Sequence, residues 1–128
     1  MPTAFRITLK DAPGALAHVA GALAEQGINL EASGGETLGG EGRITLLTSD
    51  PEATRKVLEG HNVPFEEVEL LLVTLQDNPG ALASVAQRLA AAGVNITGLI
   101  QLNRMHGQSD LGLAVDDPEK ARPVLGEG

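Results

Sequence analysis

The chain has 128 residues, of which 42% are apolar and 20% are charged, a composition typical of a folded globular protein. Its net charge of −8 and its aromatic content of 2% exclude the basic, aromatic surface that nucleic-acid binding requires. The absence of cysteine from the sequence excludes disulfides, thiolate nucleophiles and thiolate metal sites.

The apolar runs of the chain give no sign of a secretion signal or a membrane span. The opening segment MPTAFRITLKD contains charges and no apolar signal region. The apolar run at residues 68–75 is too short to cross a bilayer. We therefore expect a cytoplasmic protein with no nucleic-acid or membrane partner.

The first pattern along the chain is a strand followed by a helix. Residues 5–9 alternate apolar and polar side chains, which is the period of a half-buried strand. Pro13 suits the first turn of a helix, and Gly27 suits the left-handed residue that ends one. Between them, an apolar stripe at helical spacing is predicted to face the core: Leu16, Val19, Ala20 and Leu23.

Two strands, a second helix and a fourth strand follow. Residues 28–37 and 43–48 are predicted to form a hairpin, and residues 63–70 a last strand. Asp50 before Pro51 predicts the cap of a helix that reaches about residue 58. The hairpin has a glycine-rich connection, which we interpret as a loop and not as a phosphate cradle because no Gly-Lys-Ser/Thr follows: Gly34, Gly35, Gly39, Gly40 and Gly42.

The same pattern occurs twice. Residues 7–30 align without gaps to residues 73–96 with 14 of 24 positions identical, and residues 44–58 align to 111–125 with 7 of 15 identical. The offset is 66 in the first block and 67 in the second, so one extra residue lies between the blocks of the second copy. Alanine-rich composition would not produce the shared Asp, Pro, Gly and Asn positions, so the chain contains a duplication.

Each copy predicts the order β-α-β-β-α-β, an α+β fold of the ferredoxin-like type with an antiparallel sheet and helices on one face. We place the first module at residues 1–69 and the second at 70–128, where the last strand is missing. Residues 66–75 look long enough to be the last strand of the first module and continue as the first strand of the second. The missing strand predicts an unpaired edge beside residues 71–75, which another subunit or another part of the chain should cover.

Two pairs of short motifs resemble the signature of the ACT domain family. They are Asp11-Ala12-Pro13-Gly14-Ala15-Leu16 with Gly27-Ile28-Asn29-Leu30, and Asp77-Asn78-Pro79-Gly80-Ala81-Leu82 with Gly93-Val94-Asn95-Ile96. In that family a polar residue and Pro-Gly form the turn from the first strand to the first helix, and a Gly-x-Asn segment enters the second strand. The resemblance covers nearly the whole chain. It implies a regulatory domain that binds an amino acid near this turn, often at an interface between two such modules.

The residue types at each turn fit a zwitterionic ligand. A helix N-terminus offers N–H groups and a positive dipole end to a carboxylate, and a glycine there lets the ligand approach the backbone. An aspartate can neutralise an ammonium group, and an asparagine amide can bridge both ends. The predicted ligand-binding residues are Asp11, Ala12, Gly14, Ala15, Leu16 and Asn29 in the first copy, and Asp77, Asn78, Gly80, Ala81, Leu82 and Asn95 in the second.

Structural roles stay open for the same residues. Asp11 and Asp77 can instead cap the helix, and Asn29 and Asn95 can fix the turn after glycine through backbone hydrogen bonds. The copies also differ, with Ala12 against Asn78 and His18 against Ser84. The two pockets are therefore not expected to be equivalent, and one of them can have lost binding.

No catalytic or metal-binding pattern accompanies these motifs. His18, His61 and His106 lack the spacing of a metal site, and no nucleophile motif is present in the sequence. We predict a non-catalytic regulatory protein without cofactor or metal, which binds an amino acid, forms a homodimer and acts on another protein such as a metabolic enzyme. The alternative is a regulatory small subunit or assembly module of an amino-acid-metabolism enzyme, with weak or no ligand binding.

Overall fold

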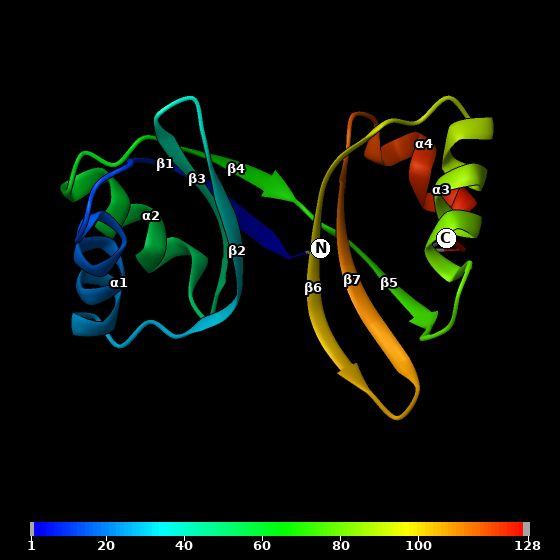
Figure 1. Cartoon of the computed structure of the whole chain (residues 1–128), viewed down its shortest axis with the longest axis horizontal. Helices are drawn as coiled ribbons and strands as arrows, with labels where there is room; N and C mark the ends of the chain where they lie inside the picture. Colours follow the sequence, from blue (N-terminus) through cyan, green and yellow to red (C-terminus); the bar gives the residue numbers. More distant parts are fainter. Residues whose placement is uncertain (1, 127–128) are drawn as a thin grey trace. The chain divides into compact units, whose positions relative to one another are not determined.

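The computed structural model describes residues 2–126 (Figure 1). They form two compact units, of which one is Thr3–Val68 and the other is residues 69–126 together with Pro2. Each unit has one antiparallel sheet with two helices on one face. This arrangement confirms the predicted α+β class with two ferredoxin-like modules.

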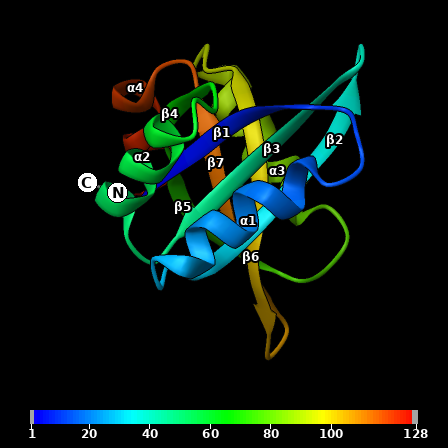
Figure 2. The same cartoon turned by 90° about the vertical axis from the view of Figure 1, so that its left-hand side faces the viewer.

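The first unit has six elements in the predicted order. They are β1 (Thr3–Lys10), α1 (Ala15–Glu25), β2 (Leu30–Leu38), β3 (Glu41–Thr48), α2 (Pro51–Gly60) and β4 (Phe65–Glu69). The strand order in the sheet is β2-β3-β1-β4. Figure 2 looks onto the face of this sheet that α1 and α2 cover.

The second unit has five elements. They are β5 (Leu71–Gln76), α3 (Ala81–Ala91), β6 (Ile96–Met105), β7 (Gln108–Val115) and α4 (Pro118–Val124). The strand order is β5-β7-β6, so residues 2–126 contain no counterpart of β4 in this sheet, as predicted. The expectation that residues 66–75 serve both modules is correct except at one position, because only Leu70 separates β4 from β5.

The two sheets repeat the same register. Residue partners in the β2–β3 pair correspond to those in the β6–β7 pair at the sequence offsets of 66 and 67. Strand β6 has an additional register shift between Gln101 and Asn103, so Leu102 is the extra residue of the second copy. Because the register after this bulge matches the first sheet again, Thr37 and Arg104 occupy equivalent positions.

Each unit has its own apolar core between helices and sheet. The cores contain Phe5, Ile7, Val19, Leu23, Ile28, Leu46 and Leu58 in the first unit, and Leu71, Val85, Leu89, Val94, Leu113 and Ala121 in the second. The predicted helical stripe is correct for Val19 and Leu23 but wrong for Leu16, whose side chain is 50% exposed. Leu16 borders an open cleft instead of the core.

One polar contact lies in the interior of the first unit. The hydroxyl oxygens of Thr48 and Thr54 are 2.8 Å apart, and both side chains are buried. The equivalent residues in the second unit are Val115 and Ala121, which make no such bond. The first unit therefore has a hydrogen bond at a position where the second has only apolar contact.

The ends of α1 and α3 and the start of α2 follow the sequence signals. Gly27 (φ 71°) and Gly93 (φ 77°) adopt the predicted left-handed conformation just after α1 and α3. The carboxylate of Asp50 accepts a hydrogen bond from the N–H of Ala53 at 3.0 Å, which confirms the predicted cap of α2.

The glycine-rich connection in the first unit is shorter than expected. Gly34 and Gly35 lie within β2, and Gly42 lies within β3. Only Gly39 (φ 60°) and Gly40 (φ 82°) form the turn. A two-residue hairpin turn of this kind requires a positive φ at both positions, and glycine meets that requirement without strain.

Candidate functional site

The predicted ligand position is a tight turn over residues 12–15, between β1 and α1. The N–H of Ala15 donates to the C=O of Ala12 at 3.2 Å, and Gly14 has a φ of 87°. With Pro13 before it this is a type II turn, whose third residue needs a positive φ and therefore favours glycine. Pro13 thus precedes the helix, and the expectation that it lies in the first helical turn was wrong. The turn before α3 is the same, with Gly80 at a φ of 89°.

Neither long helix has a side-chain cap at its start. Gly14 and Gly80 are the N-cap residues of α1 and α3, and no side chain bonds to the helix there. Helix capping by Asp11 or Asp77 was therefore the wrong alternative. The first N–H groups of a helix have no partner within it, so those of α1 and α3 can bind a carboxylate from outside.

The two asparagines are bound through their main chains. The N–H of Asn29 donates to the hydroxyl of Ser49, and its C=O accepts from the N–H of Ser49, both at 3.0 Å. Asn95 makes the same two contacts with Asp116, also at 3.0 Å. These bonds tie the entry of the second strand to the end of the third strand. They give both asparagines a structural role, and ligand contact by their amides stays a prediction.

A cleft of about 330 Å³ lies between α1 and strands β2 and β3 of the first unit. Its wall is mostly apolar, formed by Leu16, Ala20, Leu30, Ile44 and Leu46, with Ser33, Glu36 and Thr37 among its polar residues. Asp11 lies beside this cleft, because the Thr37 hydroxyl donates to its carboxylate over 3.5 Å. That distance is at the limit of a hydrogen bond, so the exposed carboxylate of Asp11 is only weakly held.

The equivalent cleft of the second unit has a volume of about 280 Å³ and lies between α3 and strands β6 and β7. Its aspartate, Asp77, is bound by Arg104, whose Nε and Nη2 donate to the two carboxylate oxygens at 2.7 and 2.8 Å. These hydrogen bonds lower the pKa of Asp77. The protein's own guanidinium group therefore neutralises this carboxylate.

The two clefts thus differ at one pair of equivalent positions. Thr37 and Arg104 each contact the aspartate of their own turn. A neutral hydroxyl at 3.5 Å does little to compensate the charge of Asp11, whereas a bidentate guanidinium group compensates that of Asp77. The first cleft can accept an ammonium group at the place where the second contains Arg104.

The structure brings only part of each predicted set to its cleft. In the first unit Leu16 lines the cleft and Asp11 contacts its rim, whereas Ala12, Gly14, Ala15 and Asn29 are not among the lining residues. In the second unit Asp77, Asn78, Ala81 and Leu82 line the cleft, and Gly80 and Asn95 do not. Sequence reasoning missed Thr37 and Arg104. Only the pairing of strands β2 and β6 with their neighbours reveals them.

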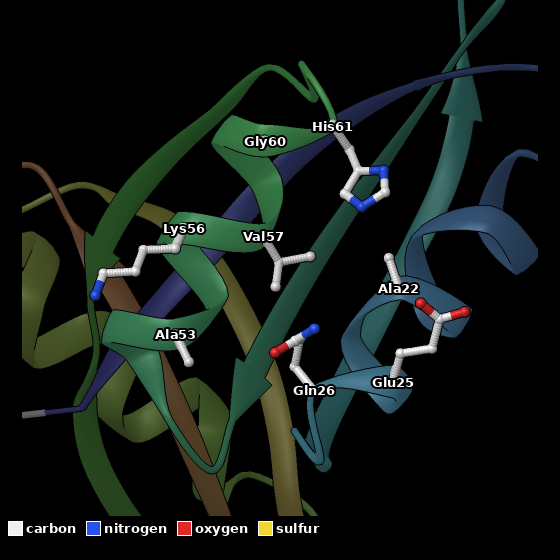
Figure 3. Close-up of a pocket in the computed structure, with 8 residues that line it drawn as sticks. All are labelled: Ala22, Glu25, Gln26, Ala53, Lys56, Val57, Gly60 and His61. Carbon is white, nitrogen blue, oxygen red and sulfur yellow. The ribbon is translucent and has the colours of Figure 1, made fainter.

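A further cleft of about 340 Å³ lies between α1 and α2 in the first unit (Figure 3). Its lining residues are Ala22, Glu25, Gln26, Ala53, Lys56, Val57, Gly60 and His61. Figure 3 shows the Lys56 side chain directed away from the others. In the second unit, Arg88 of α3 replaces Ala22 and donates to the C=O of Val124 in α4 at 3.1 Å, so a long side chain connects the two helices there.

The rings of His18 and His61 lie edge to face, with centroids 5.1 Å apart, a contact that their separation in the sequence did not suggest.

Within residues 2–126, no group of three or more His, Cys, Asp or Glu side chains could hold a metal ion. The described helices also include none that is long and apolar enough to cross a membrane.

Comparison with known proteins identifies one matching family and several similar structures. Residues 3–59 match the model of the ACT domain family. A protein from Bacteroides thetaiotaomicron has a TM-score of 0.87 and 25% identity, over 98% of this chain and 87% of that one. The regulatory subunit of aspartate kinase from Thermus thermophilus has a TM-score of 0.64 and 21% identity, over 98% of this chain and 87% of that one. The same subunit from Thermus flavus has a TM-score of 0.67 and 21% identity, over 98% of this chain and 88% of that one. No curated protein matches the sequence.

The family match covers the first copy of the repeat, and the structural likeness covers both copies. The second unit repeats the strand register, the type II turn and the Gly-x-Asn segment of the first. The first unit therefore matches the ACT domain family, and the chain as a whole spans two ACT-like modules in its fold.

Proposed function

We propose that this chain is a non-catalytic regulatory protein that binds a free amino acid in the first cleft and passes this signal to a partner protein. The observation that carries the proposal is the exposed Asp11 carboxylate at the cleft rim, whose one side-chain hydrogen bond within residues 2–126 comes from the Thr37 hydroxyl at 3.5 Å. An ammonium group there would form charge-assisted hydrogen bonds with the carboxylate. The N–H groups at the start of α1 follow Asp11 closely in the chain and would bind the ligand's carboxylate.

The likeness to regulatory proteins supports this role. Two of the similar structures are regulatory subunits of aspartate kinase, and the one from Thermus thermophilus is a ligand-free form. By analogy, this chain would regulate another protein and catalyse no reaction itself. The proposed partner is an enzyme of amino-acid metabolism.

The lining of the first cleft limits the ligand. Its apolar wall favours a side chain without charge, and Glu36 together with Asp11 disfavours an acidic one. We therefore expect neutral amino acids to bind more tightly than aspartate or glutamate. A dissociation constant of roughly 1 μM to 1 mM, or about −8 to −4 kcal/mol, is appropriate for a ligand of this size.

A second candidate function is assembly with an enzyme without ligand control. The observation in its favour is that Leu16 and Leu82, which line the two clefts, have side chains that are 50% and 41% exposed. Leucines of this kind can pack against a partner protein. In this alternative the clefts bind no amino acid, and the aspartates serve only the local structure.

A thermal-unfolding screen against the common amino acids distinguishes the two functions. Far-UV circular dichroism is the probe because the chain has no Trp or Tyr. A ligand that binds only the native state stabilises it by about 2.7 kcal/mol at a concentration of 100 times its dissociation constant. The effect should disappear in Asp11→Asn and in Thr37→Arg, which places in the first cleft the group that closes the second.

Asp77→Asn is the matched control for Asp11→Asn, because it removes the charge of the equivalent aspartate in the second cleft. It should keep the stabilisation by ligand. If Asp77→Asn abolishes the effect and Asp11→Asn does not, the ligand binds in the second cleft and the proposal for the first is wrong. If no amino acid stabilises the native chain, the sensor function is refuted and the assembly function gains support.

A further inference from the structure

Strand β5 lies at the end of its sheet, although its counterpart β1 is covered on both sides. β1 lies between β3 and β4, whereas β5 is bonded to β7. In the first unit Thr8 N–H donates to the C=O of Pro64, and in the same ladder Leu70 N–H donates to that of Pro2. The covering strand β4 therefore runs antiparallel to β1. Among residues 2–126 no strand takes the corresponding place beside β5.

The side chains of β5 differ from those of the other terminal strands. β4 has three glutamates, β2 has two glutamates and two glycines, and β6 has an arginine and a glycine. Such residues protect a sheet edge from pairing with other chains. β5, with the sequence LLVTLQ, has no charge, glycine or proline. At the positions of Arg6 and Lys10 in β1 it has Leu72 and Gln76, and the Leu72 side chain is 45% exposed.

From these observations we propose that β5 pairs with β5 of a second copy of this chain, antiparallel and about a twofold axis. The two three-stranded sheets then join into one continuous sheet. A strand without charge can lie opposite itself, whereas β4 with its three glutamates would repel its own copy. Pairing also removes part of the exposed surface of Leu72 from water.

The alternation of side chains fixes where the axis can lie. Opposed residues of an antiparallel pair point to the same face, so the axis must pass through a residue of the strand and not between two residues. With the axis at Val73 or Thr74, the side chains on the helix-covered face oppose one another. They belong to Leu71, Val73 and Leu75, which pack with the core of the second unit.

Analytical ultracentrifugation of the full chain tests this pairing. The native chain should sediment as a dimer at micromolar concentration. Leu72→Arg, which introduces the charge of Arg6 in β1 without the Glu66 that pairs with it there, should halve the mass. Leu38→Arg is the matched control, because Leu38 is 61% exposed in β2, and it should stay dimeric. Asp11→Asn should also stay dimeric, so this test is independent of ligand binding.

Cross-linking provides a second readout if Leu72→Arg fails to fold. Because the native chain has no cysteine, Val73→Cys and Thr74→Cys each introduce a single thiol near the proposed axis. At least one of them should form a disulfide-linked dimer under oxidation, and Glu67→Cys in β4 should not. A monomeric native chain, a folded Leu72→Arg dimer, loss of the dimer in Leu38→Arg, or cross-linking only at Glu67→Cys would each overturn the proposal.

Discussion

Removing either of the two buried hydroxyls of the first unit should lower the free energy of unfolding, but by unequal amounts. Thr54 donates to the C=O of Asp50 at 2.8 Å, so its only hydroxyl proton is used there. In the contact of 2.8 Å between Thr48 and Thr54, Thr48 must therefore be the donor. Valine has the shape of threonine without the hydroxyl, so Thr48→Val and Thr54→Val remove these groups one at a time without creating a cavity.

The two substitutions should differ in cost. Thr54→Val leaves the hydroxyl of Thr48 buried without its acceptor, which costs about 1–3 kcal/mol of unfolding free energy. Thr48→Val removes one bond while Thr54 still donates to Asp50, which costs about 0.5–1.5 kcal/mol. The double variant resembles the second unit, where apolar side chains occupy both positions. It should cost less than the sum of the single variants by about 1 kcal/mol.

Urea denaturation followed by far-UV circular dichroism measures these differences. The dependence of the free energy on urea should be the same in all variants, because the surface exposed on unfolding hardly changes. If Thr48→Val lowers the free energy of unfolding more than Thr54→Val does, Thr48 is not the donor in the bond between the two hydroxyls. Single costs that add to within about 0.3 kcal/mol would show that the two hydroxyls do not depend on each other.

Other predictions concern the core, the turn and the ion pair. Leu23→Ala should cost about 2–5 kcal/mol, and Leu16→Ala, at the cleft, only about 0.5 kcal/mol; equal costs in urea denaturation would place Leu16 in the core. Gly14→Ala should cost about 1–2 kcal/mol because its φ is 87°, and a neutral result in the same assay would contradict the type II turn. Hydrogen bonds from Arg104 lower the pKa of Asp77. The stability that this ion pair contributes is therefore fully present above the ordinary aspartate pKa of about 4, and it is lost as the pH falls through the lowered pKa. The difference in Tm between the native chain and Asp77→Asn should shrink below that pH, and a growing difference would contradict the pairing.

The fold could be predicted because its signals are local and occur twice. The periods of strand and helix, the cap at Asp50 and the glycines after the long helices each depend on a few neighbouring residues. The start of α1 was misplaced by two residues because a proline before glycine fits a type II turn as well as a first helical turn. Where two local structures share one sequence signal, the sequence cannot choose between them.

The candidate site could be predicted only in part, because its decisive contacts are distant in sequence. Thr37 is 26 residues from Asp11, and Arg104 is 27 residues from Asp77. Neither residue type marks a motif, and each reaches its aspartate only through the register of the strand that holds it. The motif residues at the turns were visible in the sequence, but the difference between a weakly held carboxylate and a neutralised one was not.

The bulge at Leu102 shows where this duplicated chain tolerates a change in length. Strand β6 is outermost and bonded to β7 alone, so an inserted codon there interrupts a single ladder and the pairing resumes one residue later. The same insertion in β7, which is bonded to both β5 and β6, would disturb two ladders. The two copies can therefore differ in length by one residue while Arg104 stays opposite Ser109 and in contact with Asp77.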